Sequence, residues 1–193
     1  MNLSLSLLRM HLLRAAALLL LWLAQWALVF PKWLLLSLWA NQNTLNMKKR
    51  FSRSSIALVN GIDRDTEAFD GVSAVFAMPK STDEEKAARK EAMQKALKEA
   101  TLVPYSIMEL CLESLTVVEM GLGCTNTNAA SDLGVASLNL KSAAQGAWLN
   151  VLINLGGIRD EAFVNEYRTK GEEILQKALP LADKIYNEIL QSL

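Results

Sequence analysis

The distribution of apolar residues divides the chain into two unlike parts. Residues 15–30 are apolar except for Gln25, and after Pro31-Lys32 a second apolar run covers 33–40. From about residue 58 onward, apolar residues instead recur every three or four positions between charged ones, which is the period of an amphipathic helix. No stretch alternates as a strand does. The pattern predicts an all-α helical bundle of about five to six helices, preceded by an aberrant hydrophobic segment.

Capping residues, prolines and glycines set the expected helix boundaries. Ser81 to Glu85 offers a capping box, Pro104 suits the first turn of a new helix, and Asp160 can cap the last one. Pro180 should kink or split that last helix, because proline cannot donate the backbone hydrogen bond. The expected helices cover about 63–78, 81–101, 104–121, 131–154 and 160–193.

The net charge of zero conceals an asymmetry. No Asp or Glu precedes Asp63, while seven Lys and Arg residues do, so the upstream part carries +7 and the rest −7. The acidic part has no basic stripe, which argues against nucleic-acid binding. The two cysteines, Cys111 and Cys124, form no CxxC pattern, and His11 is the single histidine. This composition excludes a zinc site or a disulfide framework and favours reduced thiols in a cytoplasmic protein.

Two interpretations of the upstream segment follow from its apolar runs. Arg9 and Arg14 precede them and a basic patch at 47–50 follows, which is compatible with a membrane anchor or signal-like segment over 15–40. However, sixteen residues are short for a bilayer, and a longer span would contain Lys32.

Polar side chains that could carry chemistry gather at one predicted helix start. Asn128, Ser131 and Asp132 place an amide, a hydroxyl and a carboxylate close together. The carboxylate could exchange protons with a bound nitrogen, although a group of N-cap residues would have the same composition.

Two further amides lie in an apolar helix. Asn150 and Asn154 are one turn apart and must find hydrogen-bond partners, either on another helix or on a bound heterocycle. Asp63 and Asp65, by contrast, are expected to be solvated capping residues of a first helical turn.

Taken in order, several short motifs resemble one enzyme family. They are DRDTEAF at 63–69, MPK at 78–80, EEKAAR at 84–89, VP at 103–104, NAASDLGVA at 128–136 and NVLIN at 150–154. Their order and spacing over about 58–193 resemble the formimidoyltetrahydrofolate cyclodeaminase and methenyltetrahydrofolate cyclohydrolase family.

The resemblance implies a helical, cytoplasmic homodimer, sometimes fused to a formiminotransferase, that binds a tetrahydrofolate derivative near the subunit interface and uses no metal. It implies either cyclisation of 5-formimidoyltetrahydrofolate to 5,10-methenyltetrahydrofolate with release of ammonia, or hydrolysis of methenyltetrahydrofolate to 10-formyltetrahydrofolate. On this basis Asp132 is the candidate catalytic residue, and the candidate substrate-binding residues are Asn128, Ser131, Asn150 and Asn154.

Two signatures of that family are missing upstream: a Pro-Gly-Gly-Gly-Ser-Ala-Ala turn and a Gly-Lys-x-x-Tyr stretch followed by an acidic helix. Both signatures become possible if the upstream DNA is read in a shifted frame, in which each codon joins the third base of one printed codon to the first two bases of the next. In that frame the codon that spans Trp39 and Ala40 must encode glycine, and the codon that spans Met47 and Lys48 must encode glutamate, because tryptophan and methionine have one codon each. We therefore predict that residues 1–57 are a frameshift product, that 58–193 form the cyclodeaminase/cyclohydrolase-like domain, and that this chain is weakly active or inactive.

Two alternative functions remain open. One is a membrane-anchored helical scaffold, and the other is a folate-binding module without catalysis.

Overall fold

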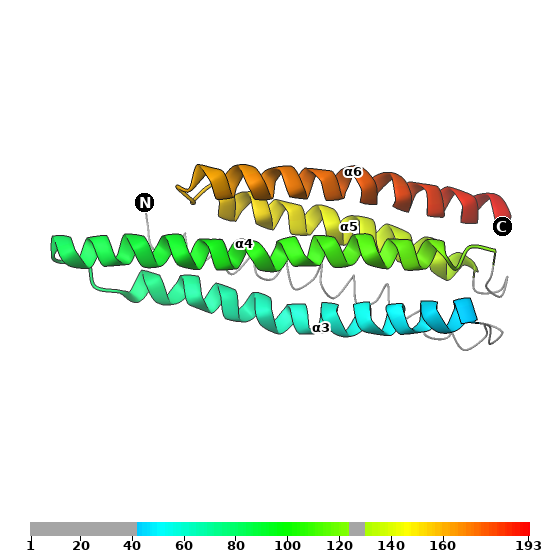
Figure 1. Ribbon diagram of the computed structural model, residues 1–193, viewed down its shortest axis with the longest axis horizontal. Coiled ribbons are helices and arrows are strands. Elements are labelled where there is room, and N and C mark those ends of the chain that lie inside the picture. Colours follow the sequence, from blue (N-terminus) through cyan, green and yellow to red (C-terminus); the bar gives the residue numbers. More distant parts are fainter. Residues whose placement is uncertain (1–41, 124–129) are drawn as a thin grey trace.

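The computed structural model describes residues 42–123 and 130–193, which form an antiparallel helical bundle. Its helices are α3 (Gln42–Ala77), α4 (Asp83–Glu119), α5 (Ala130–Leu155) and α6 (Glu161–Ser192). Figure 1 shows that successive helices run in opposite directions along one long axis. The all-α prediction is confirmed. The described part holds four helices instead of five to six, because the helix boundaries predicted at Pro104 and Pro180 lie inside continuous helices.

The first correction concerns the start of α3. The predicted helix start at Asp63 is wrong, since α3 begins at Gln42 and passes residue 57 without interruption. Met47, Phe51, Ser54 and Leu58 are buried and continue one helix face at intervals of three to four residues. Residues 1–41, including the apolar segment 15–40, lie outside the described part. The frameshift origin of residues 1–57 stays a prediction that the coding DNA tests.

The second correction concerns Pro104 and Pro180. The predicted helix start at Pro104 and the predicted split at Pro180 are wrong, because both prolines lie inside continuous helices, α4 and α6. Pro180 is exposed, so the carbonyl that it deprives of a donor is on the solvent side of α6. Pro104 is buried, and its missing hydrogen bond is replaced from α5, as described below.

The helix caps agree with the sequence. The capping box is confirmed, with the Glu85 amide donating to Thr82 Oγ1 over 3.2 Å and the Thr82 amide donating to Glu85 Oε2 over 3.2 Å. Asp160 caps α6 by accepting a hydrogen bond from the Phe163 amide over 3.1 Å. These local signals fix where α4 and α6 begin.

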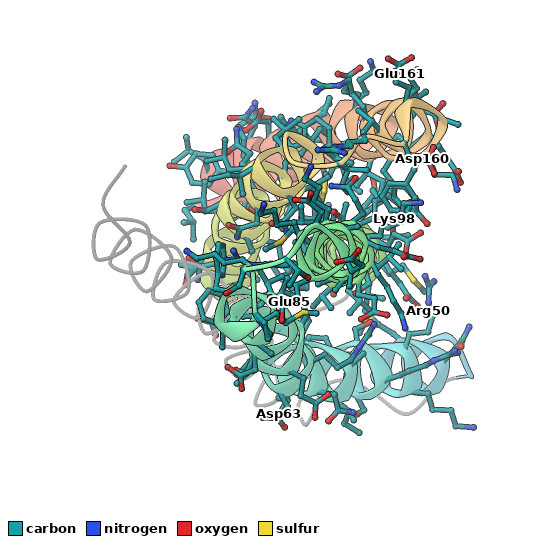
Figure 2. The ribbon with its side chains drawn as sticks, turned by 90° about the vertical axis from the view of Figure 1, so that its left-hand side faces the viewer. Arg50, Asp63, Glu85, Lys98, Asp160 and Glu161 are labelled. Atoms are coloured by element: carbon teal, nitrogen blue, oxygen red, sulfur yellow. The ribbon has the colours of Figure 1, made fainter. Side chains whose placement is uncertain are left out.

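The core forms around α4, which lies between the other helices in the end view of Figure 2. One face of α5 consists of small residues that are buried and permit close helix packing, Ala136, Ala143, Ala144 and Ala147. Among the described helices, α4 alone is long and apolar enough to cross a membrane, and 56% of that window is buried within the bundle.

Two serine hydroxyls in the core lack a hydrogen-bond partner among the described residues, Ser54 Oγ and Ser114 Oγ. Ser114 is fully buried, so its hydroxyl is desolvated without compensation. We expect Ser114→Ala to raise the free energy of unfolding by about 1 kcal/mol. The matched control is Ser137→Ala, because Ser137 is equally buried but its Oγ donates to Gly134 O over 2.8 Å. Urea unfolding should give different changes in the free energy of unfolding for the two variants, and equal changes would contradict the prediction.

Candidate functional site

A groove of about 450 Å³ lies over the first half of α4, between the second half of α3 and the last turns of α5. Both flanking helices pack on α4, which forms the floor. The volume lies in the range of small-molecule sites, and the lining is mostly apolar with a few polar groups, as such sites require. The lining residues are Asp65, Ala68, Phe69, Val72, Phe76, Met93, Leu97, Ala100, Pro104, Asn150, Ile153, Asn154 and Gly157.

Asp65 is the carboxylate of this groove. The prediction of a solvated first turn at Asp65 is wrong, because this residue lies within α3 and is half-buried on the groove. The helical spacing in the sequence could have identified Asp65 as a residue of this groove. Phe69, Val72 and Phe76 follow Asp65 at intervals of three or four residues, so one α3 face carries a carboxylate at the end of an apolar stripe.

Asn154 replaces the hydrogen bond that Pro104 removes. Proline has no amide hydrogen, so the carbonyl four residues earlier, that of Ala100, loses its helical donor. Asn154 Nδ2 donates to this same Ala100 oxygen over 2.8 Å. The pair joins α5 to α4 at the groove and explains why α4 continues through a buried proline.

We expect Asn154→Ala to lower the free energy of unfolding by about 1–3 kcal/mol, because the Ala100 carbonyl would be left unpaired in a partly buried place. Adding Pro104→Ala should recover much of this loss, because the alanine amide can donate to Ala100 O within the helix. Chemical denaturation of the two single variants and the double variant would show the coupling. Strictly additive changes would mean that the two residues act independently.

The predicted site residues on α5 lie at its two ends. Asn150 and Asn154 line the groove, and no hydrogen bond joins the Asn150 side chain to another described residue. Ser131 and Asp132 lie in the first turn of α5, where Ser131 is exposed and Asp132 half-buried. Asp132 and Asn150 are eighteen residues apart, about 27 Å along the helix axis. Asn128 lies outside the described residues, and its role stays a prediction.

Contacts between α4 and the α5–α6 connection fix the end of the groove. Gln94 Nε2 donates to Gly157 O over 2.9 Å, and the Arg159 amide donates to Gln94 Oε1 over 2.7 Å. Lys98 Nζ bonds Asp160 Oδ2 over 2.7 Å, and both residues are labelled in Figure 2. This hydrogen bond and that from the Phe163 amide hold the pKa of Asp160 below its usual value. The groove is therefore preformed on this side.

Other reactive groups do not add to the site. Cys111 is buried, and burial raises the pKa of its thiol to about 12, so it remains protonated and unreactive near neutral pH. Within the described ranges, no three His, Cys, Asp or Glu side chains gather where a metal ion could bind. The chemistry available in the groove therefore comes from one carboxylate and two amides.

Known proteins resemble the chain in both sequence and fold. The methenyltetrahydrofolate cyclohydrolase of Methylorubrum extorquens is 40% identical over 132 residues, which cover 68% of this chain and 64% of that protein. The formimidoyltransferase-cyclodeaminase of Sus scrofa is 34% identical over 66% of this chain, but this match spans only 24% of that longer protein.

The fold has a solved counterpart. The formiminotetrahydrofolate cyclodeaminase of Thermotoga maritima superimposes with a TM-score of 0.71, covering 92% of this chain and 86% of the other, at 22% identity. The family model described as formiminotransferase-cyclodeaminase matches residues 40–173. The chain therefore belongs to the formiminotransferase-cyclodeaminase family.

Proposed function

We propose that the groove between α3, α4 and α5 binds the pterin part of a tetrahydrofolate derivative and that the enzyme acts on its one-carbon group. The observation that carries the proposal is the meeting of Asp65, Asn150 and Asn154 along an apolar groove of about 450 Å³. A pterin combines flat apolar faces with an edge of hydrogen-bond donors and acceptors. Apolar walls with a few convergent polar groups fit that chemistry.

Two related reactions are compatible with this site. In the cyclisation, N10 of 5-formimidoyltetrahydrofolate attacks the amidine carbon, and the departing nitrogen takes up a proton and leaves as ammonia. In the hydrolysis, water adds to the methenyl carbon, the bond from this carbon to N5 breaks, and 10-formyltetrahydrofolate forms. Each reaction needs a group that moves a proton, and a carboxylate can do this. Asp65 is our candidate within the groove, and Asp132 remains the candidate from the sequence.

The cellular location, oligomeric state and partner of the protein are part of the same proposal. We place it in the cytoplasm as a homodimer, with a formiminotransferase as a separate or fused partner. The buried thiol of Cys111 suits a reducing compartment, and exposed apolar residues on α5 suit a subunit interface. Fractionation tests the location, because a membrane-anchored scaffold would appear with the membranes and would not bind folate.

Turnover of both substrates tests the proposed function. We expect weak turnover of one substrate by the present chain and faster turnover by the frame-restored protein, in which residues 1–57 are replaced by those of the shifted frame. Methenyltetrahydrofolate can be followed spectroscopically and ammonia release by a coupled assay. Folate binding without turnover in both proteins would instead support a non-catalytic module. Folded proteins that neither bind nor convert a folate would overturn the proposal.

A further inference from the structure

The last turn of α3 is anchored by one side chain of α4. Because α3 ends at Ala77, its last carbonyls have no amide donor within the helix. Arg89 Nε donates to Val75 O over 3.0 Å, and Arg89 Nη2 donates to Phe76 O over 3.2 Å. The guanidinium carbon lies 6.0 Å from the centroid of the Phe76 ring. Arg89 therefore holds both the backbone and the ring of Phe76, which lines the groove.

This end of α3 packs outside the main core. Figure 1 shows that the α3–α4 end of the bundle reaches beyond the α5–α6 connection. The apolar residues there form a separate small cluster around three buried side chains, Val72, Val75 and Ala96. A segment with few buried contacts opens more easily than the rest of a bundle unfolds. The two hydrogen bonds from Arg89 are therefore important for keeping this wall of the groove in place.

A second side chain of α4 anchors the opposite wall. The amide of Gln94 uses both its donor and its acceptor, on the Gly157 carbonyl and the Arg159 backbone amide. The connection lies directly on α4, because a Cβ at Gly157 would be 2.7 Å from Leu97 Cδ1. Gly157 follows Asn154 by three residues, and both line the groove. Gln94 therefore holds the end of α5 at a fixed place against α4.

Both anchors belong to the helix that forms the floor of the groove. Arg89 and Gln94 are five residues apart, so they leave α4 in directions about 140° apart, one toward α3 and one toward the α5–α6 connection. We propose that Arg89 and Gln94 are positioning residues that set the width of the groove and thereby its affinity for a flat ring system. Arg89 holds the α3 wall, and Gln94 holds the α5 wall. This inference rests on the proposed function, because a pterin ring needs two walls at a fixed spacing.

Hydrogen exchange tests the two anchors without reference to folate. Arg89→Met and Gln94→Met remove the hydrogen bonds but leave the helix propensity of α4 nearly unchanged. Under native conditions, Arg89→Met should speed exchange of amides 73–78 by at least about tenfold and leave amides 156–159 unchanged, and Gln94→Met should do the reverse.

The exposed neighbours of the anchors supply matched controls. Lys90→Met and Lys95→Met should change exchange in neither segment, because both lysines are exposed on α4. Unchanged exchange in the anchor variants would overturn the proposal. Equal acceleration of both segments by one variant would also overturn it, because it would indicate general destabilisation of the bundle.

Binding of tetrahydrofolate tests the consequence for the groove. This compound carries the pterin ring but no one-carbon group, so neither reaction consumes it. Equilibrium dialysis of the full chain under reducing conditions should give a Kd about tenfold higher for Arg89→Met and for Gln94→Met than for the parent. Arg89→Lys should recover only part of the affinity, because one ammonium group cannot hold two carbonyls as the guanidinium fork does.

The same variants separate positioning from catalysis. A displaced wall weakens binding of the ground state and the transition state alike, so KM should rise while kcat stays within about twofold of the parent. An unchanged Kd in both anchor variants, despite faster local exchange, would overturn the positioning role. If the parent itself binds no tetrahydrofolate, the proposed function fails, while the exchange rates still show whether the anchors hold the two walls.

Discussion

Asp65→Asn is expected to lower kcat/KM by a factor of about 10²–10⁴, the range in which a positioned acid or base contributes to turnover. Asparagine keeps the size and shape of the side chain but cannot exchange a proton at working pH. Asp65 is half-buried on the groove, next to the apolar face made by Phe69 and Val72. The loss should fall on kcat with little change in KM or folate affinity, because the amide can still donate and accept hydrogen bonds in the groove.

The chain supplies a matched control two residues away. Asp63 lies on the same helix but is exposed, and Figure 2 shows it at the outer edge of the bundle. Asp63→Asn makes the same chemical change and should leave kcat/KM within about twofold of the parent, as for a solvated surface residue. Circular dichroism and the unfolding midpoint would verify that both variants fold. Equal activity of the Asp65→Asn variant and the parent would exclude Asp65 as the acid or base.

Asp63 and Asp65 show how much of the candidate site could be predicted from the sequence. Acids before an apolar run are typical of a helix N-terminus, and that local rule placed both residues in a first turn. The rule failed because α3 begins at Gln42, so both acids lie within the helix. The helix period alone separates them, since Asp65 precedes the apolar positions that face α4 and α5. The two asparagines of the groove could be predicted because amides in an apolar helix require partners.

Pro104 is a second position where the neighbouring residues alone led to a wrong prediction. From the sequence, a proline after a long helix indicates a new start, because it removes a helical hydrogen bond. In the structure a residue fifty positions away, Asn154, donates to the freed carbonyl of Ala100. That compensation is a property of tertiary packing and leaves no local signal. The caps at Thr82 and Asp160 were predictable for the opposite reason, since every partner lies within a few residues.

Gly171→Ala is expected to lower the free energy of unfolding by about 1–3 kcal/mol, the usual cost of overpacking a core. Gly171 is buried in α6 where the ring of Trp148 from α5 lies directly on the backbone. An added Cβ would be 2.7 Å from Trp148 Cε3 and closer still to Cζ3, so the rigid ring would have to move. Because α5 also carries Asn150 and Asn154, displacing Trp148 should weaken folate binding as well.

A second glycine separates this clash from the general effect of glycine in a helix. Gly71 of α3 is exposed, and nothing lies within 4 Å of its Cβ position. Gly71→Ala should therefore raise the free energy of unfolding by about 0.5–1 kcal/mol, because alanine favours the helix and meets no neighbour. Combining Gly171→Ala with Trp148→Leu should cost less than the sum of the two single changes, because the smaller side chain frees the space. Strict additivity, or a stabilising Gly171→Ala, would show that the contact between Trp148 and Gly171 does not set the spacing of α5 and α6.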